Sequence, residues 1–235
     1  FQIKPIGILH SPFKEKFGIP RQTGLIKSAS AHIEFFPPYN DPSAFKGLES
    51  FSHIWLTFCF HKNDAQKWRP LIRPPRLGGN EKIGVFASRS SFRPNSLGMS
   101  VVELLAVEVL SGTTRLNIAC PDILDGTPIF DIKPYIAYSD SYEKADCGFA
   151  QHTPKAELTV EFNSQCKISL ARLNPMYEGK LELLIKETLS FDPRPAYHQS
   201  QEKNDGKEYG IRLYDLNIRW RVLNKIAEVL SIEKI

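Results

Sequence analysis

The chain has 235 residues, 42% of them hydrophobic and 24% charged, and carries a formal net charge of +4. This composition excludes a disordered or fibrous chain and indicates a globular protein with room for one large β domain or two unequal domains. No apolar run approaches the roughly 18 residues of a membrane span, and the first ten residues do not follow the pattern of a signal peptide. We therefore expect a cytoplasmic protein that does not enter a membrane.

The chain up to about Tyr142 is dominated by short, alternating apolar patterns that predict β-strands. One face of residues 53–60 is wholly apolar, which is typical of a central strand, and Ser111 and Gly112 are expected to form the tight turn of a hairpin. The expected strands are residues 2–9, 31–36, 53–60, 82–88, 99–110 and 114–120, with a short helix at 42–48. Many short strands with few helices predict a closed or nearly closed antiparallel β-barrel.

The composition changes after Asp140, and residues 140–154 are interpreted as a linker. A helix is expected at 179–189, followed by strands at 212–222 and 225–232. The predicted fold is therefore mainly β: an antiparallel β-barrel N-terminal domain at 1–145 and a smaller α+β C-terminal domain at 155–235.

Several common functional signatures do not occur in the sequence. It has neither the Gly-x-Gly-x-x-Gly pattern of dinucleotide-binding folds nor a Gly-x-x-x-x-Gly-Lys phosphate loop, and it has no Gly-x-Ser-x-Gly nucleophile elbow. The six histidines are scattered, so no metal site is expected. A hydrolase that uses carboxylates is disfavoured because no paired acid motif is found.

The densest chemistry lies at residues 86–100, which read F-A-S-R-S-S-F-R-P-N-S-L-G-M-S. Pro94 fixes its own φ and favours an extended conformation for Arg93, so Arg89 and Arg93 are expected on a stiff loop. Guanidinium groups bind carboxylates or phosphates with two parallel hydrogen bonds. This loop is therefore a candidate anion site, although solvated surface arginines remain the alternative.

A basic segment precedes that loop, and it contains one aromatic residue, Trp68. Its cations are Lys62, Lys67, Arg69, Arg73, Arg76 and Lys82. Such a segment can contact a phosphate backbone while the indole stacks on a base. A solvated loop is the alternative.

Two further loops carry polar groups next to glycine. Residues 18–24 read G-I-P-R-Q-T-G, and residues 124–128 read L-D-G-T-P. By themselves, these residues predict only turns.

Taken together, these segments resemble the TsaA-like family typified by TrmO. The resemblance spans residues 3–142 and rests on P-I-G-I-L-H-S-P-F, G-I-P-R-Q, G-L-E-S-F-S-H-I-W-L, the R-P-N-S-L-G-M-S core and D-I-L-D-G-T-P-I-F-D-I-K-P-Y. The D-P-R-P-A-Y segment at 192–197 is similar to that of the bacterial members with a C-terminal extension.

The resemblance implies a methyltransferase that uses S-adenosylmethionine to methylate N6 of threonylcarbamoyladenosine at position 37 of tRNA. It also implies a β-barrel fold, a homodimer and no metal. Carried over by motif, the cofactor contacts are Pro20, Arg21, Gln22, His61, Lys62, Arg89, Met99, Leu124, Asp125, Gly126 and Thr127.

The chemistry of the cofactor and of the substrate suggests a role for individual residues. Arg89 or Arg21 is expected to bind its carboxylate, and residues 124–127 its adenine or ribose. The expected catalytic residues are Asp125, as a candidate proton acceptor, and Arg93 with Asn95, which are expected to orient the threonylcarbamoyl carboxylate.

The expected partner is tRNA, contacted by residues 62–82 and by Trp68. Arg194, Tyr197, Arg219 and Arg221 are further candidate contacts. Affinity that falls steeply with salt is expected for such a complex. The alternative function is a non-catalytic RNA-binding β-barrel, which a titration with S-adenosylmethionine distinguishes from the enzyme.

Overall fold

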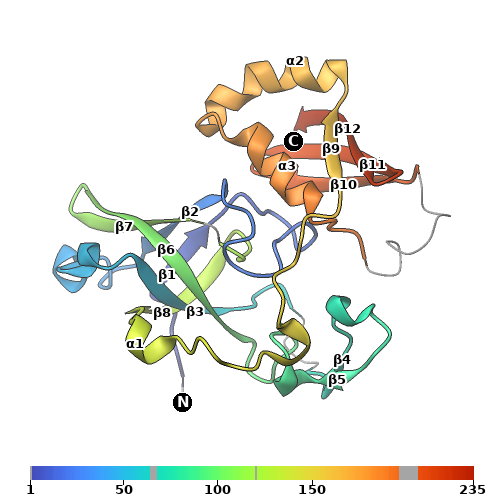
Figure 1. The fold of residues 1–235 in the computed structure, drawn as a ribbon. Coiled ribbons are helices and arrows are strands. Elements are labelled where there is room, and N and C mark those ends of the chain that lie inside the picture. Colours follow the sequence, from blue (N-terminus) through green and yellow to red (C-terminus); the bar gives the residue numbers. More distant parts are fainter. Residues whose placement is uncertain (1, 64–67, 120, 196–205) are drawn as a thin grey trace. The chain divides into compact units, whose positions relative to one another are not determined.

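The computed structural model describes residues 2–63, 68–119, 121–195 and 206–235. The chain forms two compact units (Figure 1). The barrel unit comprises Phe1–His10, Ser30–Ala119 and Gly126–Thr153, and the mixed unit comprises Ser11–Ala29, Cys120–Asp125 and Pro154–Ile235. Among the described residues, no helix is long and apolar enough to cross a membrane.

Six strands of the barrel unit close into an antiparallel barrel in the order β1-β2-β7-β6-β3-β8. They are β1 (Gly7–His10), β2 (Ser30–Phe35), β3 (His53–Cys59), β6 (Leu97–Leu110), β7 (Thr113–Ala119) and β8 (Thr127–Pro134). Closure removes the sheet edges, whose unpaired backbone groups would otherwise invite association. The expected barrel is therefore confirmed.

Alternation along the strands fills the barrel. Ile54, Leu56 and Phe58 of β3 are buried, whereas the intervening residues are more exposed. Ser111 and Gly112 join β6 to β7 with φ values of 50° and 79°. Two positive φ values match the twist of the flanking strands, so the expected hairpin turn is confirmed.

The described residues between β3 and β6 contain less strand than expected. The predicted strand at 82–88 is wrong: β5 covers only Ile83–Gly84, pairs with β4 (Leu71–Ile72), and is followed by a 3-10 turn at Val85–Ala87. Another 3-10 turn covers Pro75–Leu77. Prolines at 70, 74 and 75 remove backbone donors, which explains why long ladders do not form here.

Other connections in the barrel unit contain short helical turns. The expected helix at 42–48 is two 3-10 turns, Pro42–Phe45 and Leu48–Ser50, separated by Gly47 in a left-handed conformation. Helix α1 (Ala137–Asp140) precedes the expected linker at 140–154, which contains a 3-10 turn at Gly148–Ala150.

The mixed unit contains a four-stranded sheet in the order β10-β11-β12-β9. Figure 1 shows two helices along one face of this sheet. The elements are β9 (Thr159–Phe162), α2 (Ser164–Leu173), a 3-10 turn at Asn174–Tyr177, α3 (Leu181–Ser190), β10 (Glu208–Leu213), β11 (Leu216–Leu223) and β12 (Ile226–Lys234).

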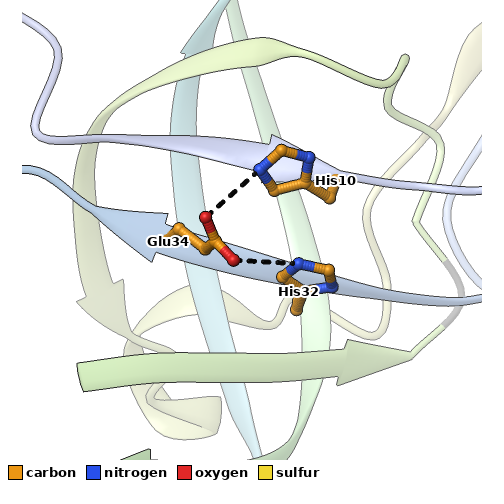
Figure 2. A group of neighbouring side chains, drawn as sticks. All are labelled: His10, His32 and Glu34. Atoms are coloured by element: carbon orange, nitrogen blue, oxygen red, sulfur yellow. Dashed lines mark ion pairs between the residues drawn. The ribbon is translucent and has the colours of Figure 1, made fainter. Parts of the chain in front are cut away.

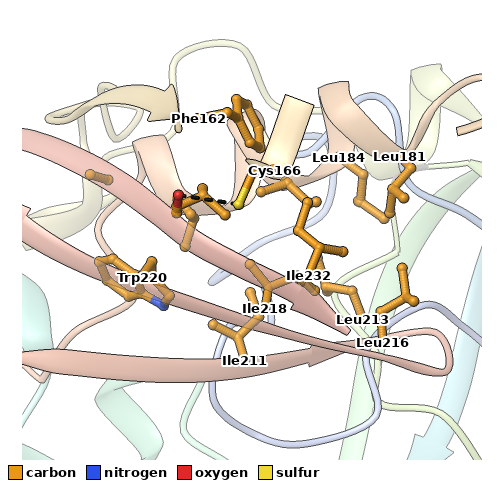
Figure 3. Packing of buried hydrophobic residues seen from close by; sticks show 14 of the residues in the cluster. Phe162, Cys166, Leu181, Leu184, Ile211, Leu213, Leu216, Ile218, Trp220 and Ile232 are labelled. Atoms are coloured by element: carbon orange, nitrogen blue, oxygen red, sulfur yellow. Dashed lines mark hydrogen bonds between the residues drawn. The ribbon is translucent and has the colours of Figure 1, made fainter. Parts of the chain in front are cut away.

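The core of the mixed unit is formed between these helices and the sheet (Figure 3). Trp220 and Ile218 of β11 are fully buried, together with Leu181 and Ile185 of α3. The single strand expected at 212–222 is wrong, because the chain reverses at Tyr214 and Asp215 to pair β10 with β11. Sequence reasoning also missed α2, whose N-cap Asn163 accepts a hydrogen bond from the Cys166 backbone N–H.

Part of the N-terminal sequence belongs to the mixed unit. Phe13 is buried and forms an isolated bridge with Leu213, and the Tyr214 N–H donates to the Pro12 oxygen over 2.7 Å. Residues 11–29 therefore pack with the C-terminal sheet and helices. The boundaries of independently folding domains, 1–145 and 155–235, stay a prediction.

Candidate functional site

One end of the barrel gathers the segments that sequence analysis singled out. Strands β3 and β6 are antiparallel, with Cys59 opposite Leu97, so the segment that follows β3 lies beside the segment that precedes β6. The Phe60 N–H donates to the Ser96 oxygen over 2.8 Å, and the Asn63 side-chain amide donates to the Ser91 oxygen over 2.9 Å. These bonds bring residues 60–63 against the R-P-N turn.

The R-P-N turn is closed by a hydrogen bond from the Ser96 N–H to the Arg93 oxygen, with Ser96 at a φ of 51°. Pro94 and Asn95 at its tip are exposed. Gly98 then enters β6 so close to Phe58 that a Cβ would lie 2.3 Å from the ring. A residue without a side chain is therefore required at position 98 for this loop to leave the barrel as it does.

The two arginines of the loop have different roles in the structure. Arg93 Nη1 donates to the Ser88 oxygen over 2.9 Å and to the Val85 oxygen over 3.3 Å, which holds the loop in shape. Arg89 is exposed, and its Nη2 donates to the Met99 oxygen over 3.3 Å. Arg89 and Met99 thus lie together at the start of β6.

His61 joins a third segment to this end of the barrel. Its Nδ1 lies 3.3 Å from the hydroxyl of Thr127, which is buried. The Gly126 N–H donates to the Leu9 oxygen, and a Cβ at Gly126 would lie 3.9 Å from His61 Nε2. Gly126 and Thr127 therefore lie next to His61, and Lys62 is exposed beside it.

Asp125, just before Gly126 in the chain, is held within the mixed unit. Its Oδ1 accepts from the Ser11 backbone N–H over 3.0 Å, and its Oδ2 pairs with Lys14 Nζ over 2.8 Å. The Asp125 N–H donates to the Phe13 oxygen. These interactions hold the Asp125 carboxylate in a defined position.

The G-I-P-R-Q loop also lies in the mixed unit. Pro20 and Arg21 line a cavity of about 50 Å³, together with Lys155, Glu157 and Phe191. This volume suits a few water molecules rather than a nucleoside. Gln22 and Leu124 are half-buried in the same unit.

The structure therefore divides the predicted site residues. The barrel unit brings together His61, Lys62, Arg89, Arg93, Asn95, Met99, Gly126 and Thr127. The mixed unit contains Pro20, Arg21, Gln22, Leu124 and Asp125. Lys14, the ionic partner of Asp125, was not expected from the sequence.

Exposed aromatic rings beside arginines are a feature that sequence reasoning missed. Phe86 is 71% exposed with the Arg93 guanidinium 5.7 Å from its ring centroid, and Phe92 is 38% exposed with that of Arg69 at 5.0 Å. Trp68 is also exposed. The available signal was the placement of Trp68 directly before Arg69 and of Phe92 directly before Arg93.

A second group that the sequence did not reveal lies on the outer face of β1 and β2 (Figure 2). His10 and His32 each face one oxygen of the Glu34 carboxylate. Burial, followed by the charge of Arg115, lowers the pKa of His32, and the hydrogen bond from Arg115 lowers the pKa of Glu34. Alternation could have placed all three side chains outside the barrel, but not next to one another.

The structure tests the further tRNA contacts suggested for the C-terminal region. The expectation for Arg194 is wrong, because its side chain is 6% exposed and forms two hydrogen bonds with the buried Asp192. Arg219 pairs with Glu208, and Arg221 with Glu228. Tyr197 lies outside the described residues.

Comparisons with known proteins agree with this arrangement. The family model of the tRNA-methyltransferase O N-terminal domain matches residues 8–141, and that of the TrmO C-terminal domain matches residues 155–235. A tRNA (adenine(37)-N6)-methyltransferase of Escherichia coli is 46% identical over 99% of this chain and 98% of its own.

Two further comparisons extend this picture. A putative S-adenosylmethionine-dependent methyltransferase of Pseudomonas aeruginosa is 42% identical over 93% of this chain and 91% of its own. A crystal structure of TrmO from Pseudomonas aeruginosa superposes with a TM-score of 0.81 at 35% identity, covering 99% of this chain and 98% of that one.

Proposed function

Since the chain belongs to the tRNA-methyltransferase O (TrmO) family, we propose that it is an S-adenosylmethionine-dependent enzyme that methylates N6 of adenine 37 in tRNA. The observation that carries the proposal is the 46% identity, over nearly the whole of both chains, to a relative named for this reaction. The substrate nucleoside is proposed to be threonylcarbamoyladenosine, as the resemblance implies.

The residues at the barrel end suit the cofactor. S-adenosylmethionine presents a carboxylate, a ribose and an adenine, and it supplies a methyl group on a sulfonium. Arg89 is exposed and offers a cation for the carboxylate, which Arg21 also offers in the mixed unit. The N–H groups of Asp125 and Gly126 already donate to Phe13 and Leu9, so the main chain of residues 124–127 is proposed to offer carbonyl acceptors to the adenine or ribose. His61, Lys62 and Met99 complete the contacts in the barrel unit, and Pro20 and Gln22 those in the mixed unit.

Positioning is the main contribution that these residues make to methyl transfer. An in-line displacement requires the nucleophile and the methyl group to be aligned, and stiff loops provide this alignment without a large loss of entropy during the reaction. The R-P-N turn is such a loop. Pro94 restricts its backbone, and the Arg93 side chain donates hydrogen bonds to two carbonyl oxygens, those of Val85 and Ser88.

Arg93 and Asn95 are proposed to orient the carboxylate of the threonylcarbamoyl group. Arg93 uses Nη1 for the loop, and within the described residues no hydrogen bond is found for its Nε or Nη2. The guanidinium therefore keeps donors for an anion. Asn95 lies exposed at the tip of the same turn, two residues further on.

The N6 proton must leave during the reaction, and Asp125 is the proposed acceptor. Its interactions with Lys14 and Ser11 hold the carboxylate in a defined position. Replacement of Asp125 by Asn keeps the shape of the side chain but removes its basicity. We expect turnover to fall by about 10²-fold or more while cofactor affinity is largely retained. If turnover and cofactor affinity fall by the same factor, Asp125 has a structural role instead.

The basic segment at 62–82 is proposed to contact tRNA, with the exposed ring of Trp68 stacking on a base. Phe86 and Phe92 extend this surface. Affinity for tRNA should then fall steeply between low and physiological salt, because each neutralised phosphate releases counterions. A flat response would contradict an interface based on phosphates.

We further propose that the enzyme acts as a cytoplasmic homodimer and that the transfer needs no metal ion. Three apolar side chains near the end of β6, Leu105, Val109 and Leu110, are about half exposed. Exposed apolar side chains on a strand offer a surface that another chain can cover. Light scattering of the wild type and of Val109→Asp tests this, since the charged variant should shift the population toward monomers.

The decisive experiment for the function is methyl transfer from labelled S-adenosylmethionine to tRNA with and without threonylcarbamoyl at position 37. The proposal predicts incorporation only with the modified tRNA. Methyl incorporation into both tRNAs would support the methyltransferase activity but contradict threonylcarbamoyladenosine as the required substrate. Binding of tRNA without any incorporation or cofactor binding would support the alternative, a non-catalytic RNA-binding barrel.

Two variants separate the roles of the arginines. Arg93→Ala should lose activity while retaining affinity for S-adenosylmethionine, whereas Arg89→Ala should weaken that affinity by about tenfold or more. Calorimetric titration gives the affinity, and near-UV circular dichroism shows whether the loop stays folded. Loss of cofactor binding in Arg93→Ala, with its fold intact, would contradict the assignment of Arg93 to the substrate.

A further inference from the structure

We propose that His10, His32 and Glu34 form a zinc-binding site on the outer face of the barrel, separate from the residues assigned to methyl transfer. The two histidines and the carboxylate offer one ligand atom each, and all three atoms lie within 4.8 Å of one another. Figure 2 shows both imidazole rings turned toward the same carboxylate.

The register of two strands creates this group. β1 and β2 are antiparallel, and His10 lies directly opposite His32. Glu34 is two residues further along β2, so it shares the face of His32. The neighbouring positions Leu9 and Ile33 point inward and are fully buried, which fixes the face on which the three polar side chains lie.

The distances between the ligand atoms approach those of a real site. His10 Nε2 lies 3.7 Å from one carboxylate oxygen, and His32 Nε2 lies 3.5 Å from the other. Ligand atoms of a tetrahedral zinc site lie about 3.3 Å apart, because each is about 2.0–2.1 Å from the ion. Small side-chain rotations on a rigid ladder would therefore suffice, without movement of the backbone.

The arrangement of the rings also favours a shared ligand. The rings of His10 and His32 stack with centroids 4.9 Å apart and planes inclined by 26°. Two parallel imidazoles with their Nε2 atoms directed to the same carboxylate can both reach one ion. Two imidazoles and one carboxylate form a donor set that zinc accepts in proteins, with water in the fourth position.

Arg115 competes with the metal for the Glu34 carboxylate. It lies opposite Glu34 on β7, and its Nη2 donates to a Glu34 oxygen over 2.7 Å. The guanidinium neutralises the carboxylate when no metal is bound and repels a cation that approaches it. The site is therefore expected to bind zinc with moderate affinity, and removal of the Arg115 charge should strengthen binding.

Zinc bound here would stabilise the barrel by joining β1 to β2. A ligand that binds only the folded state raises stability in proportion to the logarithm of its concentration over its dissociation constant. None of the three residues belongs to the predicted cofactor contacts or to the basic segment. Methyl transfer by the fully folded protein should therefore be insensitive to occupancy of the site.

The test uses the full chain without a histidine tag, treated with a chelator and dialysed before titration with zinc chloride. Calorimetry should show one ion per chain, and His32→Ala and Glu34→Gln should each weaken binding by about tenfold or more. His152→Ala, which removes an exposed histidine elsewhere in the barrel unit, is the matched control and should bind as the wild type does.

Two further measurements identify the ligands. Arg115→Gln should bind zinc about fivefold more tightly, as expected when an exposed charge is removed. The spectrum with cobalt should show nitrogen and oxygen ligands without thiolate bands. Cys147, the exposed thiol among the described cysteines, would give such bands if it bound the metal instead. Binding of equal affinity in the wild type and His32→Ala, a thiolate spectrum, or no zinc binding would each overturn the proposal.

Discussion

The barrel unit and the mixed unit differ in the exposure of their aromatic side chains. Within the described residues, every exposed large aromatic side chain belongs to the barrel unit, including Phe86, Phe92, Tyr138 and Tyr142. The described aromatic side chains of the mixed unit are buried or half-buried, with Trp220 fully enclosed. The same residue types therefore supply a binding surface in one unit and a core in the other.

The architecture of each unit explains this difference. A six-stranded barrel fills its interior with one set of alternating residues and has no sheet face left to cover. Its exposed aromatic residues lie on loops, turns and the short helix α1, where they can meet a ligand. An open four-stranded sheet must bury one face under helices, so the mixed unit uses Trp220 and Phe162 to fill that layer.

The largest expected effect comes from truncation of an enclosed ring. Trp220→Ala removes a fully buried indole and leaves a cavity between sheet and helices, so the free energy of unfolding should fall by about 3–5 kcal/mol. Phe86→Ala, at an exposed ring, should change it by less than about 0.5 kcal/mol. Urea denaturation measures both variants, and similar losses in the two would contradict the comparison.

The buried ion pair of the mixed unit should be nearly as sensitive. Arg194→Met removes the guanidinium that pairs with the Asp192 carboxylate, which is 2% exposed, and should lower the free energy of unfolding by about 3 kcal/mol. Adding Asp192→Asn removes the uncompensated charge and should recover part of the loss. Asn also tolerates the positive φ of 45° at this position. If the double variant is no more stable than Arg194→Met, the buried charge of Asp192 does not cause the loss of stability.

An intermediate effect is expected at the exposed rings of the barrel unit. Phe86→Ala and Phe92→Ala should each weaken tRNA binding by about 1–3 kcal/mol, the range measured for loss of base stacking, without a change in stability. Tyr138→Ala removes a ring that is 91% exposed but lies outside both the basic segment and the loop at 86–100, so it serves as the matched control. Equal losses of affinity in all three variants would remove the special role of Phe86 and Phe92.

The smallest effect is a pH dependence from His32. Its pKa is lowered below 6.5 in the folded state, mainly by burial, so the unfolded chain binds more protons than the folded chain just below that value. Stability from this group is present above pH 6.5 and is lost as the pH falls toward the lowered pKa. His32→Gln should flatten the stability profile in this range, measured with a chelator present. An unchanged profile would mean that other groups control it.

Local patterns were sufficient for much of the barrel. Residues 53–60 and 99–110 predicted their strands because alternation reports directly which residues face inward. Ser111-Gly112 predicted its turn because its backbone conformation is a local property. The strand expected at 82–88 failed because apolar residues alone do not show whether a partner strand is in reach. Helix α2 was missed because its apolar stripe is narrow, with only Cys166, Leu170 and Leu173 buried.

The same limit holds for the candidate site. Arg89, Arg93 and the L-D-G-T-P loop were found from their sequence motifs, but the hydrogen bonds from Arg93 to Val85 and Ser88 were not. Neither was the pairing of Asp125 with Lys14, since these residues are far apart in the chain.

By itself, the sequence determined the family, the barrel class and the loops that carry the chemistry, because these depend on short patterns of residues. Only the tertiary structure decided which distant side chains meet: His61 with Thr127, Asp125 with Lys14, and His10 with His32 and Glu34. Such contacts depend on strand register, and register is set by the packing of the whole barrel rather than by any one segment.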